Sequence, residues 1–532
     1  MAEAFDYVIV GAGSAGCVVA NRLSADPSVR VLLLEAGPAP RSPWIGIPGA
    51  VSKLLTACPY NWGYMTEPEP QLNQRRIYWP RGRGLGGSSA INGMIYLRGH
   101  PLDFERWRRL GNSGWGWDDV LPLFKRSERR EGGDPALRGL SGELRITDAA
   151  TRYPFPERFV AAAQEFGLPY NEDFNSGEQE GVGHLQYNIR NGRRCTSYDA
   201  FVAPIRHRRN LVVMTNAQVA RVEIQARRAT GVTVLHRGGA HKVKATREVV
   251  LAGGAINSPQ LLMLSGVGPA AHLREKGVEV IHDAPGVGRN LHDHTCAHLV
   301  YDVPERYSVN GLTRGLGLAG EVAKYALVRK GLLALGTSHT GLFTRVMAGA
   351  EQPDIQITTR PFSFVFDGGA IGISKTPTAT TSVYHLRPEA RGALTLRSPD
   401  IADAPQMTAN FMGTPGDQAT LVAGLRLASK IMDSPFMSAC RLTTPLPDDD
   451  AAVVDMLRNT LGPVYHPVGT CRMGRDQADV VDQRLRVRGI EALRVADASI
   501  MPDIVSANTN ATVMMIGEKA ADLIREDQCA QG

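Results

Sequence analysis

The sequence predicts a mixed α/β fold made of at least two lobes. Three observations carry this prediction: the length of 532 residues, a strand–turn–helix–strand pattern over residues 6–34, and alternating residues over 378–398. A single hydrophobic core normally stops growing at about 250–300 residues, so a chain of this length is expected to divide. The first pattern is typical of a Rossmann-like lobe, and the alternation is typical of strands in a second lobe.

The overall composition indicates a soluble globular protein. Hydrophobic residues make up 43% of the chain and charged residues 21%, which is ordinary for such proteins. The formal net charge is only +6. The densest basic cluster, residues 206–209, is interpreted as a solvated loop, so we expect no nucleic-acid partner.

Cysteine usage and the N-terminal residues predict the compartment. Seven cysteines without paired spacing favour a reducing compartment over a disulfide framework. The N-terminus has an acidic lead and a short apolar run, unlike a secretory signal peptide. No stretch reaches the roughly 20 apolar residues of a membrane span. We therefore expect a cytoplasmic protein, monomeric or homodimeric, that at most lies on the inner face of the cell membrane.

The N-terminal pattern is a dinucleotide-binding fingerprint in its required context. A buried strand over residues 6–10 leads into the turn Gly-Ala-Gly-Ser-Ala-Gly at 11–16, which opens a helix. A second strand over 31–34 then ends in Glu35, 19 residues after Gly16. This spacing places an acid where ribose hydroxyls are bound.

Each glycine of the fingerprint has a physical role. Gly11 permits the tight turn, Gly13 lets the backbone approach a pyrophosphate, and Gly16 allows close helix–strand packing. The helix N-terminus offers N–H groups to the phosphates. An acid at Glu35 fits NAD or FAD and disfavours NADP. The cofactor-binding residues predicted here are Gly11, Gly13, Ser14, Ala15, Gly16, Glu35 and Ala36.

Two further motifs extend the analysis to a family. They are "GRGLGGSSAINGMIYLRGHPLDFE" at 82–105 and "GAINSPQLLMLSGVG" at 254–268. Both resemble, along their full length, the two signature patterns of the glucose–methanol–choline (GMC) flavin oxidoreductases. Three other segments are similar to that family in the same order: 285–294, 465–474 and 495–524.

The resemblance implies FAD as the cofactor. In the family, the backbone of Asn92 to Met94 runs along the flavin ring near N5, and the backbone of Val219 contacts adenine. Some members attach the flavin through a histidine one position before the asparagine; Ile91 stands there, so we expect non-covalent FAD. The remaining predicted cofactor residues are Trp62, Arg83, Gly84, Gly87, Ser88, Asn92, Gly93, Met94, Val219, Tyr465, Asp497, Ala498, Asn508 and Thr509.

The predicted catalytic pair is His466 and Asn510. His466 matches the family's catalytic histidine, and an imidazole with an ordinary pKa near 6.5 can accept the hydroxyl proton as the C–H bond breaks. Asn510 is expected opposite it across the substrate, at the start of a helix whose dipole favours the reduced flavin.

The cofactor motifs predict a discontinuous domain. Residues 1–155, 210–305 and 455–532 are expected to form the FAD-binding domain. Residues 156–209 and 306–454 are expected to form the substrate-binding domain, where family members have an antiparallel sheet.

One helix is predicted in the substrate-binding segment, over residues 318–336. It carries Leu318, Val322, Tyr325 and Ala326 on one face. We expect this face to pack against its own domain; guarding the substrate entrance or touching lipid are the alternatives.

The predicted reaction is oxidation of a primary alcohol, with electrons passing to a quinone, a dye-like acceptor or a protein. The alternatives are an oxidase that uses oxygen, a choline dehydrogenase, a hydroxynitrile lyase that binds FAD without redox chemistry, and a NAD-dependent dehydrogenase. His339 stands where choline dehydrogenases carry a glutamate, which disfavours choline. His292 and His294 resemble a family loop without a metal, so no metal is expected.

Overall fold

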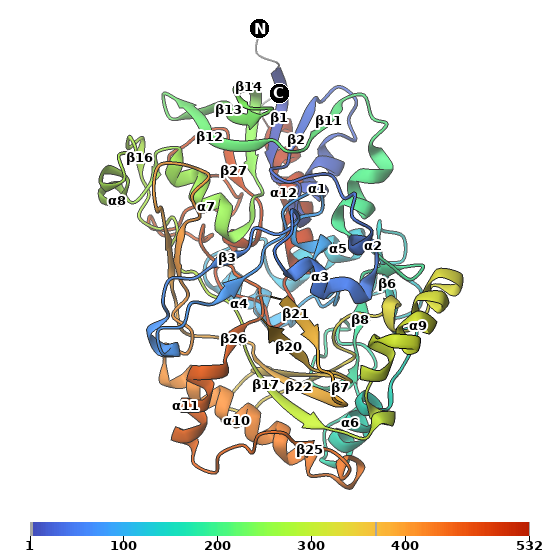
Figure 1. Cartoon of the computed structure of the whole chain (residues 1–532). Coiled ribbons are helices and arrows are strands. Elements are labelled where there is room, and N and C mark those ends of the chain that lie inside the picture. The colour runs from blue at the N-terminus through green and yellow to red at the C-terminus, as the bar shows by residue number, and fades with distance from the viewer. Residues whose placement is uncertain (1–3, 368–369, 531–532) are drawn as a thin grey trace.

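Two large sheets organise the protein. The computed structural model describes residues 4–367 and 370–530. Within these ranges, one seven-stranded sheet lies near the two chain termini and another lies at the opposite end (Figure 1). The first sheet contains parallel and antiparallel pairs and the second is antiparallel, so the predicted α/β class with a second antiparallel lobe is confirmed.

The first sheet is Rossmann-like. β1 (Ala4–Val10) lies at its centre, and the short strand β2 (Val31–Leu34) pairs parallel to it. Both strands are apolar because helices cover parallel sheets on both faces. The strand order is β11 (Leu211–Met214), β2, β1, β14 (Gly239–Leu251), β13 (Arg228–His236) and β12 (Gln218–Gln225), with β27 (Leu493–Val495) also paired to β14.

Two helices from opposite ends of the chain pack together beside this sheet. α1 (Ser14–Leu23) follows the glycine-rich turn, and α12 (Asn510–Cys529) is the last helix (Figure 1). Their close approach requires Gly517, where a Cβ would lie 2.8 Å from the carbonyl oxygen of Ala15. The C-terminal segment is therefore built into the nucleotide-binding lobe.

The second sheet covers a cavity with one face and carries helices on the other. α6 (Pro154–Glu165), α10 (Pro415–Met432) and α11 (Asp450–Thr460) lie at its outer side (Figure 1). The strand order is β25 (Arg441–Leu442), β17 (Thr295–Asp302), β22 (Thr378–His385), β19 (Ile355–Arg360), β18 (Thr340–Thr344) and β7 (Gly181–His184), with β26 (Gly462–Pro463) paired to β17.

The two sheets do not follow the predicted domain division strictly. β17 lies in the segment 210–305 and β26 lies in 455–532, yet both pair within the second sheet. The chain thus crosses between lobes inside these segments, and the division itself stays a prediction.

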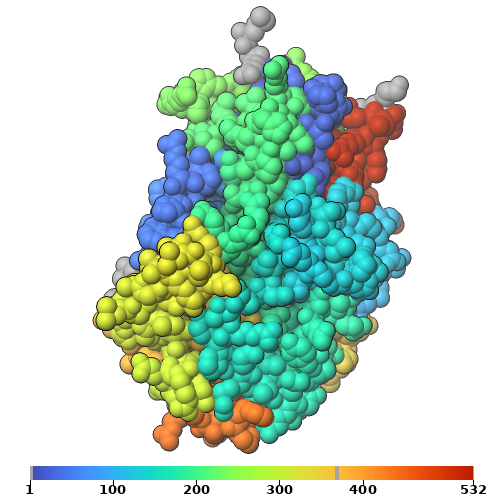
Figure 2. Space-filling model, turned by 90° about the vertical axis from the view of Figure 1, so that its right-hand side faces the viewer, coloured from blue at the N-terminus to red at the C-terminus, as the bar shows by residue number. Residues whose placement is uncertain are grey.

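The helix predicted over 318–336 is shorter, and its buried face is a different one. α9 spans Gly315–Val328 and lies on the molecular surface (yellow in Figure 2). Tyr325 and Glu321 are buried, whereas Leu318, Val322 and Ala326 are exposed. Glu321 faces inward because its carboxylate accepts a hydrogen bond from the backbone N–H of Leu332 at 2.6 Å. The expectation that this face packs against its own domain is confirmed for Tyr325 and was wrong for Leu318, Val322 and Ala326.

Shorter elements connect the lobes. The other helices are α2 (Pro43–Gly46), α3 (Val51–Leu55), α4 (Pro101–Arg109), α5 (Trp117–Ser127), α7 (Gly254–Leu264) and α8 (Ala270–Glu275). The small sheets contain β3 (Tyr64–Met65), β4 (Tyr78–Trp79), β5 (Glu128–Arg130), β6 (Leu144–Asp148), β8 (Gln186–Tyr187), β9 (Ile189–Arg190), β10 (Arg193–Arg194), β15 (Val267–Gly268), β16 (His282–Asp283), β20 (Phe364–Asp367), β21 (Ala370–Ile373), β23 (Ala393–Thr395) and β24 (Gln406–Thr408). In the part of the chain that the structure describes, no helix is both long and apolar enough to cross a bilayer.

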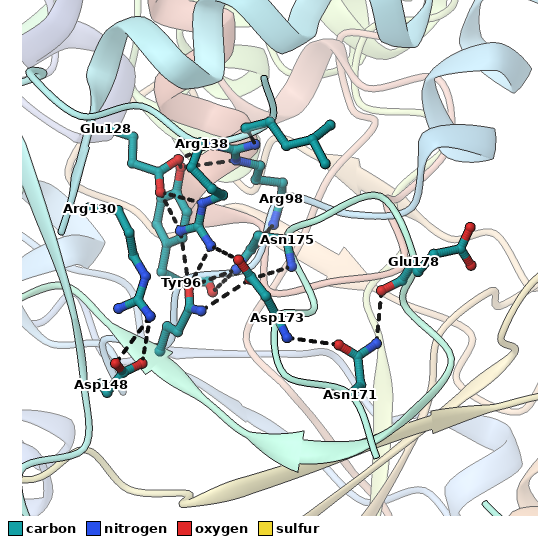
Figure 3. A network of polar contacts seen from close by, with 12 residues as sticks. Tyr96, Arg98, Glu128, Arg130, Arg138, Asp148, Asn171, Asp173, Asn175 and Glu178 are labelled. Carbon is teal, nitrogen blue, oxygen red and sulfur yellow. Dashed lines mark hydrogen bonds and ion pairs between the residues drawn. The ribbon is translucent and has the colours of Figure 1, made fainter. Parts of the chain in front are cut away.

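A buried ionic network holds the segment that follows Asn92 to Met94 (Figure 3). The side chains of Arg98, Glu128 and Arg138 are completely buried, and Glu128 binds both guanidinium groups. Arg138 also pairs with Asp173. The backbone N–H of Arg98 donates to the Asn175 side chain at 2.9 Å. The network therefore fixes the chain as it leaves the predicted flavin loop.

Candidate functional site

A cavity of about 410 Å³ lies between the two lobes. Its walls come from the glycine-rich turn and the start of α12 on one side, and from the inner face of β17, β19 and β22 on the other. Most of the predicted site residues line it: Gly11, Gly13, Ser14, Ala15, Glu35, Ala36, Trp62, Gly87, Ser88, Asn92, Gly93, Met94, Val219, Tyr465, His466, Asp497, Ala498, Asn508, Thr509 and Asn510.

Three predicted residues lie behind the cavity wall. A Cβ on Gly16 would lie 1.9 Å from the carbonyl oxygen of Gly11, so this glycine packs the helix against the turn. The Gly84 N–H donates to Glu35 at 2.9 Å. Arg83 stacks its guanidinium 5.0 Å from the centre of the Trp62 ring. These three residues support the cavity wall from behind and do not line the cavity themselves.

The glycine-rich turn fits a dinucleotide. Gly11 has φ +106°, a conformation that strongly favours glycine. No side chain caps the N-terminus of α1, so its first N–H groups stay available to a phosphate. A Cβ on Gly87 would lie 2.7 Å from the Cα of Gly13, which shows how tightly the two glycine-rich segments approach. The donors and the shape of this wall therefore suit a pyrophosphate.

Glu35 is more constrained than its sequence position indicates. Its buried carboxylate accepts backbone N–H groups from Ala12 at 3.0 Å, Gly37 at 2.8 Å and Gly84 at 2.9 Å. Burial raises the pKa of this carboxyl above its usual value, while these hydrogen bonds lower it. Glu35 thus joins three loops, and binding of ribose hydroxyls remains a prediction for it.

Asn92 is held by a residue that sequence reasoning missed. The buried Arg194 donates to the Asn92 side-chain oxygen at 2.9 Å and to its backbone oxygen at 2.6 Å. The same side-chain oxygen accepts the Met94 N–H at 3.1 Å. Arg194 therefore shapes the loop that the family resemblance places beside the flavin.

Hydrogen bonds determine which nitrogen of His466 carries the proton. The Leu386 carbonyl lies 3.1 Å from Nε2 of His294 and can only accept, so His294 donates from Nε2. Its Nδ1 is then an acceptor, and Nδ1 of His466, 3.1 Å away, must donate to it. Nε2 of His466 therefore carries the lone pair, and the amide nitrogen of Asn508 donates to it at 3.2 Å.

Burial keeps this imidazole neutral. It lowers the pKa of His466 well below its usual value, with the neighbouring His294 and Arg81 acting in the same direction. The pKa of His294 is lowered to about 3, mainly by burial. Both rings are therefore neutral at neutral pH, each with a proton on one nitrogen only. Nε2 of His466 can then act as a base.

Asp293 positions the His466 loop. Its carboxylate accepts the backbone N–H of His466 and the indole N–H of Trp79, each at 2.8 Å. Burial raises the pKa of Asp293 to about 7. His292 is also used structurally, since its Nδ1 lies 2.6 Å from the Asn290 carbonyl. In the described ranges, no group of His, Cys, Asp or Glu side chains is arranged to hold a metal ion.

The amide beside His466 belongs to Asn508. Its Nδ2 lies 3.2 Å from Nε2 of His466. Asn510 begins α12, as expected, but its side-chain oxygen accepts the Ser14 hydroxyl at 2.6 Å. The expected pairing of Asn510 with His466 is corrected to Asn508, because the start of α12 turns Asn510 toward the glycine-rich turn. The sequence contains two asparagines in "NTN", and no feature of the sequence distinguishes their roles.

His339 does not face the substrate. It is buried, does not line the cavity, and neither ring nitrogen has a hydrogen-bond partner among the described residues. Burial lowers the pKa of His339 to about 4, so the ring is neutral. The carboxylates that line the cavity, within the described part of the chain, are Glu35 and Asp497. Neither comes from the second sheet.

Comparison with known proteins agrees with this arrangement. Residues 5–296 and 388–517 match two family models, both described as GMC oxidoreductase. An alcohol dehydrogenase (acceptor) from Pseudomonas putida is 41% identical over 98% of this chain and 95% of that protein. An oxygen-dependent choline dehydrogenase from Rhizobium etli is 40% identical with the same coverage.

A solved structure has the same fold over nearly the whole chain. The crystal structure of pyridoxine 4-oxidase from Mesorbium loti has a TM-score of 0.87 and 33% identity, and covers 97% of this chain and 98% of that one. The family resemblance and the expectation of FAD are thereby confirmed. The chain belongs to the GMC oxidoreductases, whose solved structures are FAD-dependent flavoproteins.

Proposed function

We propose that the protein oxidises a primary alcohol to an aldehyde and passes the electrons to a quinone or another acceptor that is not NAD. The observation that carries the proposal is the unprotonated Nε2 of His466, which lines the cavity beside an amide donor. The Pseudomonas relative named as an alcohol dehydrogenase supports the substrate class.

The residues divide the work on the substrate hydroxyl. Nε2 of His466 accepts the hydroxyl proton as the C–H bond breaks. Nδ2 of Asn508 donates one N–H to that nitrogen at 3.2 Å, and its second N–H would donate to the alcohol oxygen and orient its carbon. Nδ1 of His466 keeps its proton because it donates a hydrogen bond to Nδ1 of His294. The pair thus holds the oxygen between one acceptor and one donor.

FAD fits the other wall of the cavity. The turn at 11–16 and the N-terminus of α1 would hold the pyrophosphate, and the loop at 92–94 would lie along the flavin. The Asn510 amide nitrogen is buried without a partner among the described residues, so it has a donor to offer the cofactor. When bound, FAD supplies a two-electron acceptor that takes a hydride at N5.

A non-covalent cofactor is part of the proposal. Ile91 carries no nucleophile, and its side chain is buried. Acid precipitation should therefore release all the FAD into the supernatant. Flavin that stays in the pellet would contradict this part of the proposal.

The experiment that tests the function is anaerobic stopped-flow reduction by alcohols. His466→Ala should slow flavin reduction by about 10²–10⁴-fold with FAD still bound, which is the usual contribution of a general base. Wild-type speed in this variant would refute the assignment. Admitting air afterwards distinguishes the acceptor: reoxidation within one turnover time would identify an oxidase, as the name of the Mesorbium relative indicates for that protein.

A further inference from the structure

The end of the cavity formed by the second sheet contains a buried cation. Arg360, the last residue of β19, lines the cavity and is 9% exposed. Its Nη2 donates to the Ser382 hydroxyl at 3.0 Å and lies 3.2 Å from Nδ1 of His298. The neighbouring wall is polar because alternate residues of β17 and β22 point inward, among them His298, Thr380 and Tyr384.

This cation has no counter-charge among the side chains that the structure describes. Within the described part of the chain, no carboxylate lies within ion-pair distance of Arg360, and its Nε has no hydrogen-bond partner. Neither group that Nη2 contacts carries a negative charge, since one is the Ser382 hydroxyl and the other is the His298 imidazole. The ring of Phe364, 5.3 Å from the guanidinium, offers only a weak cation–π contact.

Other buried arginines have more partners among the described residues. Glu128 neutralises Arg98 and Arg138. Arg194 has no carboxylate partner either, but its Nε and Nη1 donate to the carbonyl oxygens of Ile45, Ser89 and Asn92. A buried guanidinium without such partners is costly, and a carboxylate is the group that its planar donors match best. Arg360 therefore has unused binding capacity directed at the cavity.

We infer that Arg360 binds a carboxylate carried by the substrate, so that the preferred substrates are primary alcohols with an anionic far end. This inference rests on the proposed function. Arg360 and His466 line the same cavity, which places the cation and the base in one connected space. A hydroxycarboxylate would present its hydroxyl to His466 and its carboxylate to Arg360. Choline would bring a second cation to the same end.

The test compares three substrate classes on the holoenzyme and its variants. Terminal hydroxycarboxylates, alkanols of matching length and choline are assayed with a dye acceptor. A hydrogen bond to a charged group corresponds to roughly a 10- to 100-fold effect. We expect the best hydroxycarboxylate to exceed its matching alkanol by at least about tenfold in kcat/KM. Arg360→Gln should remove this preference, so that the kcat/KM values of the hydroxycarboxylate and its matching alkanol differ by less than about threefold.

Two further variants sharpen the result. Arg360→Lys keeps the charge without the planar donors and should retain only part of the preference. Arg397→Gln removes a half-exposed arginine that pairs with Glu67 and should change nothing. Equal kcat/KM for alkanols and hydroxycarboxylates, or an unchanged preference in Arg360→Gln, would overturn the inference. A phosphate monoester of a diol exceeding every hydroxycarboxylate would overturn the carboxylate assignment.

Binding provides a readout independent of turnover. Hexanoate carries the carboxylate but no hydroxyl, so it should perturb the flavin absorption and raise the melting temperature of the wild-type holoenzyme. Arg360→Gln should lose both effects, and retention of both would contradict the role of Arg360. If no alcohol reduces the flavin while hexanoate still binds through Arg360, the proposed function fails and the anion site stands.

Discussion

The proton arrangement in the His466–His294 pair makes a specific prediction about His294→Leu. His294 is buried, lies 172 residues before His466 in the chain, and accepts the His466 Nδ1–H at 3.1 Å. Leucine removes this acceptor while it keeps an apolar side chain in the site. The Nδ1–H of His466 then lacks a partner, and nothing prevents the proton from moving to Nε2, where it blocks base catalysis.

The magnitude follows from the lost hydrogen bond. A buried donor left without an acceptor costs about 1–3 kcal/mol. With about 1.4 kcal/mol per tenfold change in rate, the flavin-reduction rate at saturating alcohol should fall roughly 5- to 150-fold. The KM should change little, because Asn508 can still donate to the alcohol oxygen in the ground state.

The assay is anaerobic stopped-flow reduction, with FAD content and melting temperature measured on each variant. His294→Gln offers a side-chain carbonyl as a replacement acceptor and should recover part of the rate. His207→Ala, at an exposed position, serves as the control. Full FAD loading together with wild-type reduction by His294→Leu would show that the proton on His466 is not set by this contact.

Four other predictions follow from the geometry. Asn508→Ala should slow flavin reduction, and its effect should be less than additive with that of His466→Ala. Asn510→Ala should mainly weaken FAD binding. The reverse pattern in stopped-flow reduction and FAD titration would restore the expected pairing of Asn510 with His466. Glu128→Gln leaves the buried Arg98 without its carboxylate and Arg138 with Asp173 alone, and should cost about 3–5 kcal/mol in denaturant unfolding. A loss below about 1 kcal/mol would contradict the network in Figure 3. Four buried histidines, His292, His294, His339 and His385, have their pKa values lowered to about 3 or 4. The stability that their neutral forms permit is therefore complete above pH 6.5, the ordinary value, and is lost as the pH falls below it; a melting temperature that is flat from pH 7 to pH 5 would refute this. The exposed Leu316 and Leu327 of α9, with basic residues beside them, should bind the protein to vesicles that contain anionic phospholipid. The double variant Leu316→Ser, Leu327→Ser should weaken this binding, measured by co-sedimentation, by about tenfold. Equal binding to neutral vesicles would contradict the charge argument.

The sequence by itself determined the fold class, the family and the cofactor. These signals are local: the turn at 11–16 needs glycine at a positive φ angle and an open helix N-terminus within six positions, so its pattern is readable along the chain. His466 could be identified as the candidate base for the same reason, because its surrounding motif at 465–474 is contiguous.

Only the tertiary structure decided how the side chains of the site are paired. Asn508 and Asn510 are two positions apart in one motif, yet one contacts His466 and the other contacts Ser14, 496 residues away. The role of His294 depends on a carbonyl 92 residues later in the chain. Among the described residues, the lack of a carboxylate beside Arg360 is likewise a property of its surroundings, which three strands from separate segments create. Such contacts arise when segments far apart in the sequence pack together, so they cannot be predicted from a local sequence pattern.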